Sequence, residues 1–61
     1  MGLFMVEVHA EMKNRHGQRF RIIRWQRQYF VQQYDQRLGG WLMGFGLPRL
    51  ADAKREMRIF R

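Results

Sequence analysis

The beginning of the chain alternates strictly between two kinds of side chain. Every second residue is apolar in the run Phe4, Val6, Val8, Ala10 and Met12, and the residues between them are mostly polar. A period of two predicts a half-buried strand, because successive side chains of a strand point to opposite faces. Residues 13–17 break the pattern, and the alternation resumes over residues 18–26. This order predicts a β-hairpin.

The length of the connection sets the expected pairing of this hairpin. With residues 13–17 as the loop, the expected pairs are Met12 with Gln18, Ala10 with Phe20 and Val8 with Ile22 on one face, and Glu11 with Arg19 and His9 with Arg21 on the other. We therefore expect the even-numbered residues to form the core. The carboxylates should neutralise part of the opposite face.

The rest of the chain contains two further strand patterns and one helical pattern. Residues 26–28 resemble a tight connection, residues 29–34 a third strand, residues 35–40 a turn with a Gly pair, and residues 41–45 a fourth strand. Gly44 and Gly46 suggest a bulge or a helix close to the backbone. After Pro48, apolar residues recur at helical spacing at Leu50, Ala53, Met57 and Phe60.

Together these patterns predict one α+β domain that spans residues 1–61. We expect a four-stranded antiparallel meander followed by one C-terminal amphipathic helix, in the order ββββα. The helix should cover the sheet face that carries Phe4, Val6, Val8, Phe20 and Ile22. The opposite face would then stay open for a partner.

The residue types that are missing narrow the range of functions. The chain has no Ser, Thr or Cys, which removes the usual nucleophiles, and its five acidic residues are scattered. We expect no enzyme activity and no cofactor. Glu7, His9 and Glu11 share one strand face, but this set is more typical of a solvated face than of a metal site, so we expect no metal.

The size and the N-terminal sequence bear on assembly and location. A chain of 61 residues without Cys has a marginal core, so stability must come from its nine aromatic residues, from a partner or from a homodimer. The start Met1-Gly2-Leu3-Phe4 lacks the features of a signal or membrane segment. We expect a cytoplasmic protein without a membrane role.

The charge pattern favours an anionic partner. The formal net charge is +7, with ten Arg and two Lys against five acids, and no acidic residue lies between Arg15 and Tyr34. Arginine forks beside flat rings suit phosphates and bases, so we expect binding to DNA or RNA, duplex or single-stranded. The candidate binding residues are Arg19, Arg21, Arg24, Trp25, Arg27, Gln32, Arg37 and Trp41. The aromatic members also have the alternative role of filling the core, Trp41 above all.

Arg21 and Arg24 would point to opposite faces of a regular strand. We expect a bulge at Ile22 and Ile23 that brings both arginines to the open face, because an unpaired arginine in so small a core is costly.

From residue 20 to residue 60 the chain resembles the AP2 and integrase-type DNA-binding domain, a three-stranded sheet packed on one helix. The resemblance rests on Phe20-Arg21-Ile22-Ile23-Arg24, on residues 29–34, on Trp41-Leu42-Met43-Gly44-Phe45 and on the helix of residues 50–60. It implies a sheet that enters the major groove, with DNA contacts from Arg21, Arg24 and Trp41. Ile22 departs from the family, which has glycine there, and residues 1–12 add a strand.

A protein partner is the alternative to nucleic acid. Phages and mobile elements encode small basic inhibitors or regulators that bind acidic surfaces of other proteins, and this chain has their size and charge. Exposed Leu38, Leu42, Met43 and Leu47 would favour that class. A GC-rich coding sequence is a third explanation for the arginines, one that requires no binding role.

Overall fold

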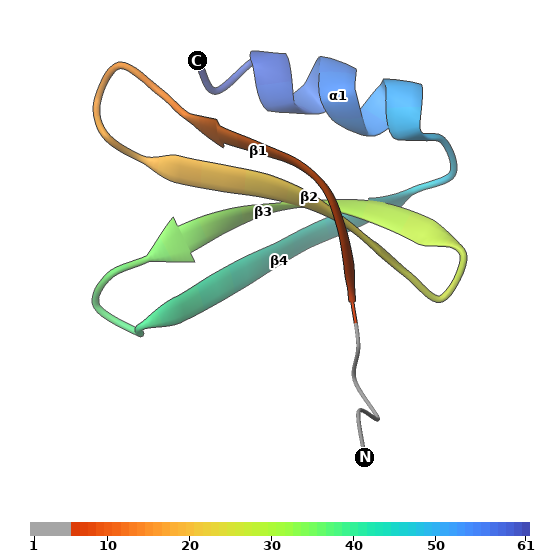
Figure 1. The fold of residues 1–61 in the computed structure, drawn as a ribbon, viewed down its shortest axis with the longest axis horizontal. Helices are drawn as coiled ribbons and strands as arrows, with labels where there is room; N and C mark the ends of the chain where they lie inside the picture. Colours follow the sequence, from red (N-terminus) through yellow and green to blue (C-terminus); the bar gives the residue numbers. More distant parts are fainter. Residues whose placement is uncertain (1–5) are drawn as a thin grey trace.

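The computed structural model describes residues 6–61 and shows a single antiparallel sheet followed by one helix (Figure 1). The elements are β1 (Glu7–Lys13), β2 (Arg19–Trp25), β3 (Gln28–Asp35), β4 (Gly40–Leu47) and α1 (Leu50–Arg58). The strands lie side by side in chain order. The predicted ββββα meander is therefore confirmed. Phe4, which we expected in the first strand, lies outside the described residues.

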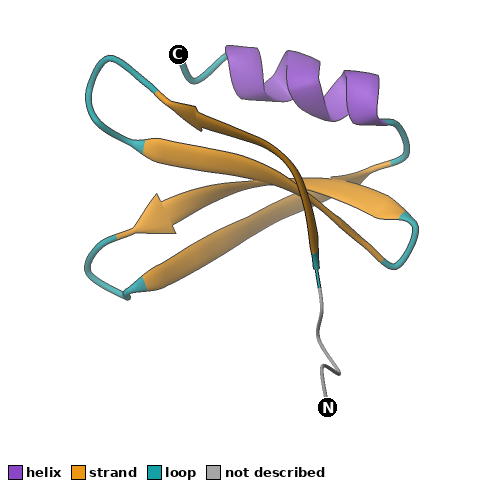
Figure 2. Cartoon of the chain, in the orientation of Figure 1, coloured by secondary structure: helices purple, strands orange, loops and turns teal. Residues whose placement is uncertain are grey.

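The helix lies on one face of the sheet (Figure 2). It packs mainly on β2 and β3 and also reaches β4. Its own Ala53 is completely buried, and Phe60, just past the helix end, stacks on Phe20 with ring centroids 5.0 Å apart. The helix begins at Leu50, so Pro48 precedes it instead of opening its first turn. The core on this face is formed by Phe20, Ile22 and Ala53.

The pairing of β1 with β2 differs by two residues from the predicted register. Ala10 lies opposite Ile22 and Glu11 opposite Arg21. The reason lies in the loop, which closes between Asn14 and Gln18: the Asn14 N–H donates to the Gln18 carbonyl at 2.9 Å. A shift of two residues keeps each side chain on its expected face, because the period of a strand is also two.

A bulge at His9 changes the face of the residues before it. The register shifts between Val8 and Ala10, so that Val8 pairs with Ile23 instead of Ile22. A bulge adds one unpaired residue and reverses the alternation beyond it. The prediction that Val8 and Val6 lie in the core beneath the helix is therefore wrong: Val8 is 45% exposed on the helix-free face, and Val6 is exposed as well.

Strand β2 itself is regular. Its pairing with β3 runs without a shift from Phe20 to Trp25, so the bulge that we expected at Ile22 and Ile23 is absent from this strand. The two isoleucines point to opposite faces, yet both are buried, with 0% and 1% of their surface exposed. On the helix-free face Ile23 and the buried Phe30 pair across the strands. Trp25 packs on Phe30 with ring centroids 6.2 Å apart. Ile23, Trp25 and Phe30, with Val8 at their edge, form a second apolar cluster.

The glycines of β4 have two different roles. Gly44 lies where two residues of β4 oppose Val31, and a Cβ atom there would be 3.1 Å from the Val31 carbonyl oxygen. This confirms the bulge that the sequence suggested. At Gly46 a Cβ atom would overlap the Gln28 side chain and would be 3.2 Å from the Phe30 ring. Side chains of β3, and not the helix, therefore crowd this position.

The part of the chain that the structure describes contains no helix long and apolar enough to cross a membrane.

The two-sided core can be tested with a pair of aliphatic substitutions. Ile22→Ala removes a fully buried side chain and should lower the free energy of unfolding by about 2–4 kcal/mol. Val8→Ala removes a half-exposed side chain and should cost less than about 1 kcal/mol. Urea denaturation followed by circular dichroism measures both. An equal loss for the two variants would contradict the position of Val8 described above.

Asn14 connects the first hairpin loop to the C-terminus. Its Nδ2 donates to the Phe60 carbonyl and to Gln18 Oε1, both at 2.8 Å, and its Oδ1 accepts from the backbone N–H groups of His16 and Gln18. Asn14→Ala should cost about 1–3 kcal/mol, because it removes all four bonds. Asn14→Asp retains the acceptor but puts an oxygen in place of the donor, facing the Phe60 carbonyl, so it should lower the melting temperature as well. If Asn14→Ala left the melting temperature unchanged, these bonds would contribute nothing to stability.

Candidate functional site

Five side chains gather on the helix-free face, at the end of the sheet near the first and third hairpin loops. Alternation along β2 places Arg19 and Arg21 on this face, and the pairing of strands brings the side chains of β3 and β4 next to them. We call this group the Arg-aromatic cluster; its members are Arg19, Arg21, Gln32, Tyr34 and Trp41. It occupies the half of the face that the second apolar cluster leaves free.

The guanidinium groups of both arginines lie over the aromatic rings of this cluster. The Arg21 guanidinium carbon lies 4.3 Å from the Trp41 ring centroid, and that of Arg19 lies 5.3 Å from Trp41 and 5.2 Å from Tyr34. Tyr34 and Trp41 contact each other edge to face, with ring centroids 5.3 Å apart. A cation–π contact uses no N–H group of the guanidinium, so these donors remain available to a phosphate or carboxylate.

A hydrogen bond fixes the orientation of Arg21. Its Nε donates to Gln32 Oε1 at 2.7 Å, and Gln32 is the one polar residue that is buried in the described chain. The bond uses only one of the five guanidinium N–H groups. The four N–H groups on the two terminal nitrogens of Arg21 take no part in this bond.

The charges of the cluster are not neutralised by ion pairs. Within residues 6–61, the salt bridges are His9 with Glu7 and Arg55 with Asp52, and neither involves the cluster. Partial burial lowers the pKa of Arg21; Glu11, opposite on β1, raises that pKa and Arg19 lowers it. Arginine nevertheless stays protonated in proteins. The site thus holds a partly desolvated positive charge, which an incoming anion would stabilise.

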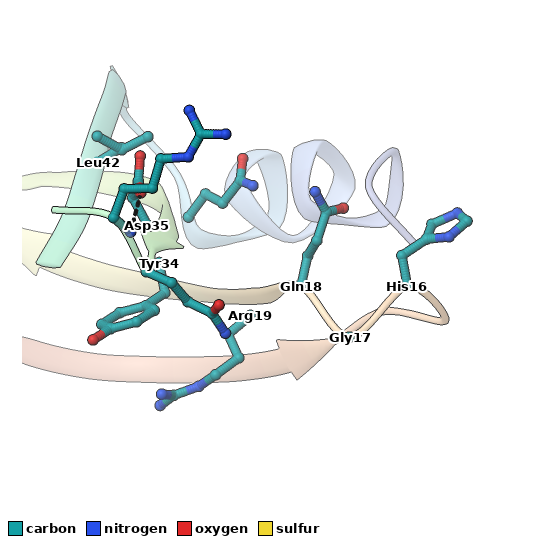
Figure 3. Close-up of a pocket in the computed structure, with 10 residues that line it drawn as sticks. His16, Gly17, Gln18, Arg19, Tyr34, Asp35 and Leu42 are labelled. Carbon is teal, nitrogen blue, oxygen red and sulfur yellow. Dashed lines mark hydrogen bonds between the residues drawn. The ribbon is translucent and has the colours of Figure 1, made fainter. Parts of the chain in front are cut away.

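An open hollow of about 530 Å³ lies beside the cluster, between the first and third hairpin loops (Figure 3). Its lining is polar and mostly uncharged or basic: His16, Gly17, Gln18, Arg19, Gln33, Tyr34, Asp35, Gln36, Arg37 and Leu42. Among these residues Asp35 alone is acidic, and its Oδ1 accepts the backbone N–H of Arg37 at 2.8 Å. Arg19, at the start of β2, and Arg37, in the β3–β4 turn, thus supply positive charge to one hollow.

The structure brings together four of the eight candidate binding residues and separates the others. Arg19, Arg21, Gln32 and Trp41 form most of the cluster, so Trp41 is half-buried there and is not part of the core. Trp25 shares the face but packs on Phe30 in the second apolar cluster. Arg37 lies at the hollow, and Arg27 lies at the β2–β3 turn, at the opposite end of the sheet.

Arg24 is on the other face, because β2 has no bulge. It pairs with Tyr29 on β3 and with Glu7 on β1, and its guanidinium carbon lies 5.9 Å from the Tyr29 ring centroid. It is exposed at the end of the strand, so its charge needs no buried partner. The expectation that Arg21 and Arg24 act on one face is therefore wrong.

Tyr34 is the member of the cluster that sequence reasoning left out of the binding residues. It lies opposite Trp41 because the turn between β3 and β4 closes at Asp35 and Gly40. This turn contains Gly39, whose φ of 67° favours glycine, and the Gly pair is therefore visible in the sequence. Counting outward from the Gly pair gives the Tyr34–Trp41 pair, so the signal was present.

Among residues 6–61 no group of three or more His, Cys, Asp or Glu side chains is arranged to hold a metal ion. Comparison with known proteins gives no match to a protein-family model, to a curated protein or to a solved structure.

The turn that carries Arg27 has a backbone conformation that side chains disfavour. Gln26 and Arg27 have φ of 51° and 65°, and both positions of such a two-residue hairpin favour Asn and Gly. The double substitution Gln26→Asn, Arg27→Gly should stabilise the fold by about 1 kcal/mol, since it relieves this strain. Thermal unfolding measures the change; a loss of stability would show that these two side chains make contacts worth more than the strain.

Proposed function

We propose that this chain is a cytoplasmic nucleic-acid-binding protein that uses the Arg-aromatic cluster as its contact surface. The observation that carries the proposal is the pair of arginines, Arg19 and Arg21, that lie over aromatic rings on a sheet face without a helix. Their N–H edges suit backbone phosphates, and the rings beside them suit bases. The net charge of +7 adds long-range attraction and release of counterions.

The hollow extends this surface past the end of the sheet. Arg37 can contact a further phosphate there, and the amides of Gln18, Gln33 and Gln36 offer donors and acceptors to base edges. The resemblance to the AP2 and integrase-type domain implies contacts from Arg21 and Trp41, which share this face. It also implies one from Arg24, which lies on the other face, so only part of that binding mode is available to this chain.

The proposal predicts that affinity falls as the salt concentration rises. It also predicts that the loss of affinity differs between variants that remove the same charge from different surfaces. Fluorescence anisotropy with labelled duplex DNA, single-stranded DNA and RNA should show affinity falling with salt. A plot of the logarithm of the binding constant against the logarithm of the salt concentration gives a slope that counts the phosphate contacts. The double variant Arg19→Ala, Arg21→Ala should lower the magnitude of this slope by about 2 and weaken binding at least tenfold. The control Lys54→Ala, Arg58→Ala removes the same charge from the exposed side of α1 and should have a much smaller effect.

Two outcomes would contradict the proposal. Lack of binding at low salt to every oligonucleotide would exclude nucleic acid. Equal losses of affinity in the two double variants would show that only the net charge matters for binding. Circular dichroism must show that both variants are folded, because the Arg21 stack on Trp41 itself contributes about 1 kcal/mol. Arg21→Lys retains the charge but not the fork, and should bind more weakly than the parent.

Binding to an acidic protein surface is the second candidate function. The observation in its favour is the exposure of Leu38, Leu42 and Met43, since apolar side chains beside positive charge are typical of protein interfaces. Leu47 is only partly exposed. A pull-down from lysate with and without nuclease separates the two functions: a partner that survives nuclease digestion favours the protein interface.

A further inference from the structure

The first hairpin separates from the rest of the sheet at its loop end. The pairing of β2 with β3 ends at Phe20 and Gln33. Strands β1 and β2 stay paired one residue further, at Lys13 and Arg19. Figure 1 shows the first and third hairpins diverging at this end of the molecule. Residues 13–19 therefore form a two-stranded ribbon that extends beyond the part of the sheet where β2 and β3 pair.

Two open hollows divide this ribbon between them. Residues 16–19 line the hollow of about 530 Å³ beside the Arg-aromatic cluster, which the β3–β4 turn also lines. Residues 12–15 line a second hollow of about 570 Å³, together with Ile59 and Arg61 beyond the end of α1. The ribbon is thus a ridge with one hollow on each side, and we call it the hairpin ridge.

Both hollows are basic. Lys13, Arg15 and Arg61 supply positive charge to the second hollow, and none of the residues that line it is acidic. Arg19 and Arg37 do the same for the first hollow. Within residues 6–61 none of these five side chains takes part in a salt bridge. Each side of the hairpin ridge therefore offers a place for an anion.

Asn14 holds the hairpin ridge in one shape. Its side chain has two N–H donors and two acceptor lone pairs, and its four hydrogen bonds use all of them. Arg15 and His16, at the tip, are exposed, and their side chains make no hydrogen bond to another described residue. The tip thus presents free donors on a fixed frame.

We propose that the hairpin ridge enters the major groove of duplex DNA, with the sugar-phosphate backbone of one strand over each hollow. This inference rests on the proposed nucleic-acid binding and names its ligand. A groove is bordered by two backbones, which matches two basic hollows on either side of one ridge. A single strand has only one backbone and would have to cross the ridge to reach both hollows.

The dimensions of the hairpin ridge select among the grooves. The major groove of B-DNA is about 12 Å wide and about 8.5 Å deep and admits a two-stranded ribbon, whereas the minor groove is only about 6 Å wide. Paired strands lie about 4.8 Å apart, and the three residues between Phe20 and His16 span about 10 Å. The major groove of duplex RNA is too narrow for side chains to read. Duplex DNA is therefore the ligand that fits.

Insertion brings the tip to the base edges. Arg15 can donate to the O6 and N7 atoms of guanine, which is the commonest specific contact in the major groove. The strand over the first hollow can continue to the Arg-aromatic cluster, because Arg19 and Tyr34 belong to both. The hairpin ridge and the cluster thus form one continuous contact surface.

Oligonucleotides of matched sequence and length test the ligand. Fluorescence anisotropy should show binding to duplex DNA at least about tenfold tighter than to either single strand or to duplex RNA. The double variant Lys13→Ala, Arg15→Ala should lose at least about tenfold in affinity for the DNA duplex. The matched control Lys54→Ala, Arg55→Ala removes one Lys and one Arg from the exposed side of α1 and should lose less than about threefold.

Methylation by dimethyl sulfate shows which groove the tip occupies. The reagent modifies guanine N7, which lies in the major groove, and adenine N3, which lies in the minor groove. The parent should protect N7 atoms and leave N3 atoms reactive, and Arg15→Ala should lose part of this protection. The pattern of the parent tests the hairpin ridge even if a variant fails to fold.

Several outcomes would overturn the inference and leave the proposed function intact. They are equal or tighter binding of single strands or of duplex RNA, methylation protection at N3 or at neither atom, and equal losses for the two double variants. Lack of binding to every oligonucleotide would overturn the inference and the proposed function together.

Discussion

The burial of two adjacent isoleucines on opposite faces of β2 is the constraint on which the rest of the fold depends. Ile22 and Ile23 are both inaccessible, although neighbouring side chains of a strand point in opposite directions. The sheet must therefore be covered on both sides at this point. The helix covers Ile22. On the other side Phe30 and Trp25 surround Ile23, and the bulge in β1 turns Val8 toward them.

This double coverage decides where the positive charge of β2 can lie. Arg19 and Arg21 are near one end of the strand and share the helix-free face, beyond the apolar cluster around Ile23. Arg24 is near the other end and emerges on the opposite face. Two arginines are therefore concentrated beside Tyr34 and Trp41, and the third is isolated. The cluster is a consequence of strand alternation around a core on two sides.

Much of this arrangement could be predicted from the sequence. The period of two before residue 13, the Gly pair at residues 39 and 40 and the helical spacing after Pro48 gave the four strands, their order and the helix. These signals are local, since each depends on a few neighbouring residues. The position of Arg19 and Arg21 on the helix-free face followed from the same periodicity. The faces of Gln32 and Trp41 did not, because adjacent apolar residues in β3 leave its alternation ambiguous and Trp41 was expected in the core.

What the sequence did not reveal depends on contacts between distant residues. The register of the first hairpin depends on the Asn14 side chain, which closes the loop with Gln18 and also reaches the Phe60 carbonyl. The bulge at His9 leaves no mark in the alternation of β1, because it appears only when Val8 is matched to Ile23. We placed the bulge in β2 to explain Arg24. The exposed strand end already accommodates that arginine.

The bond between Asn14 and Phe60 joins residues that are 46 positions apart in the chain. It connects the first loop to the last residues, so the C-terminal end cannot separate from the sheet without breaking a bond to that loop. Chain ends usually fray on their own, whereas segments joined in this way open as one cooperative unit. The C-terminal end and the first hairpin loop should therefore open together.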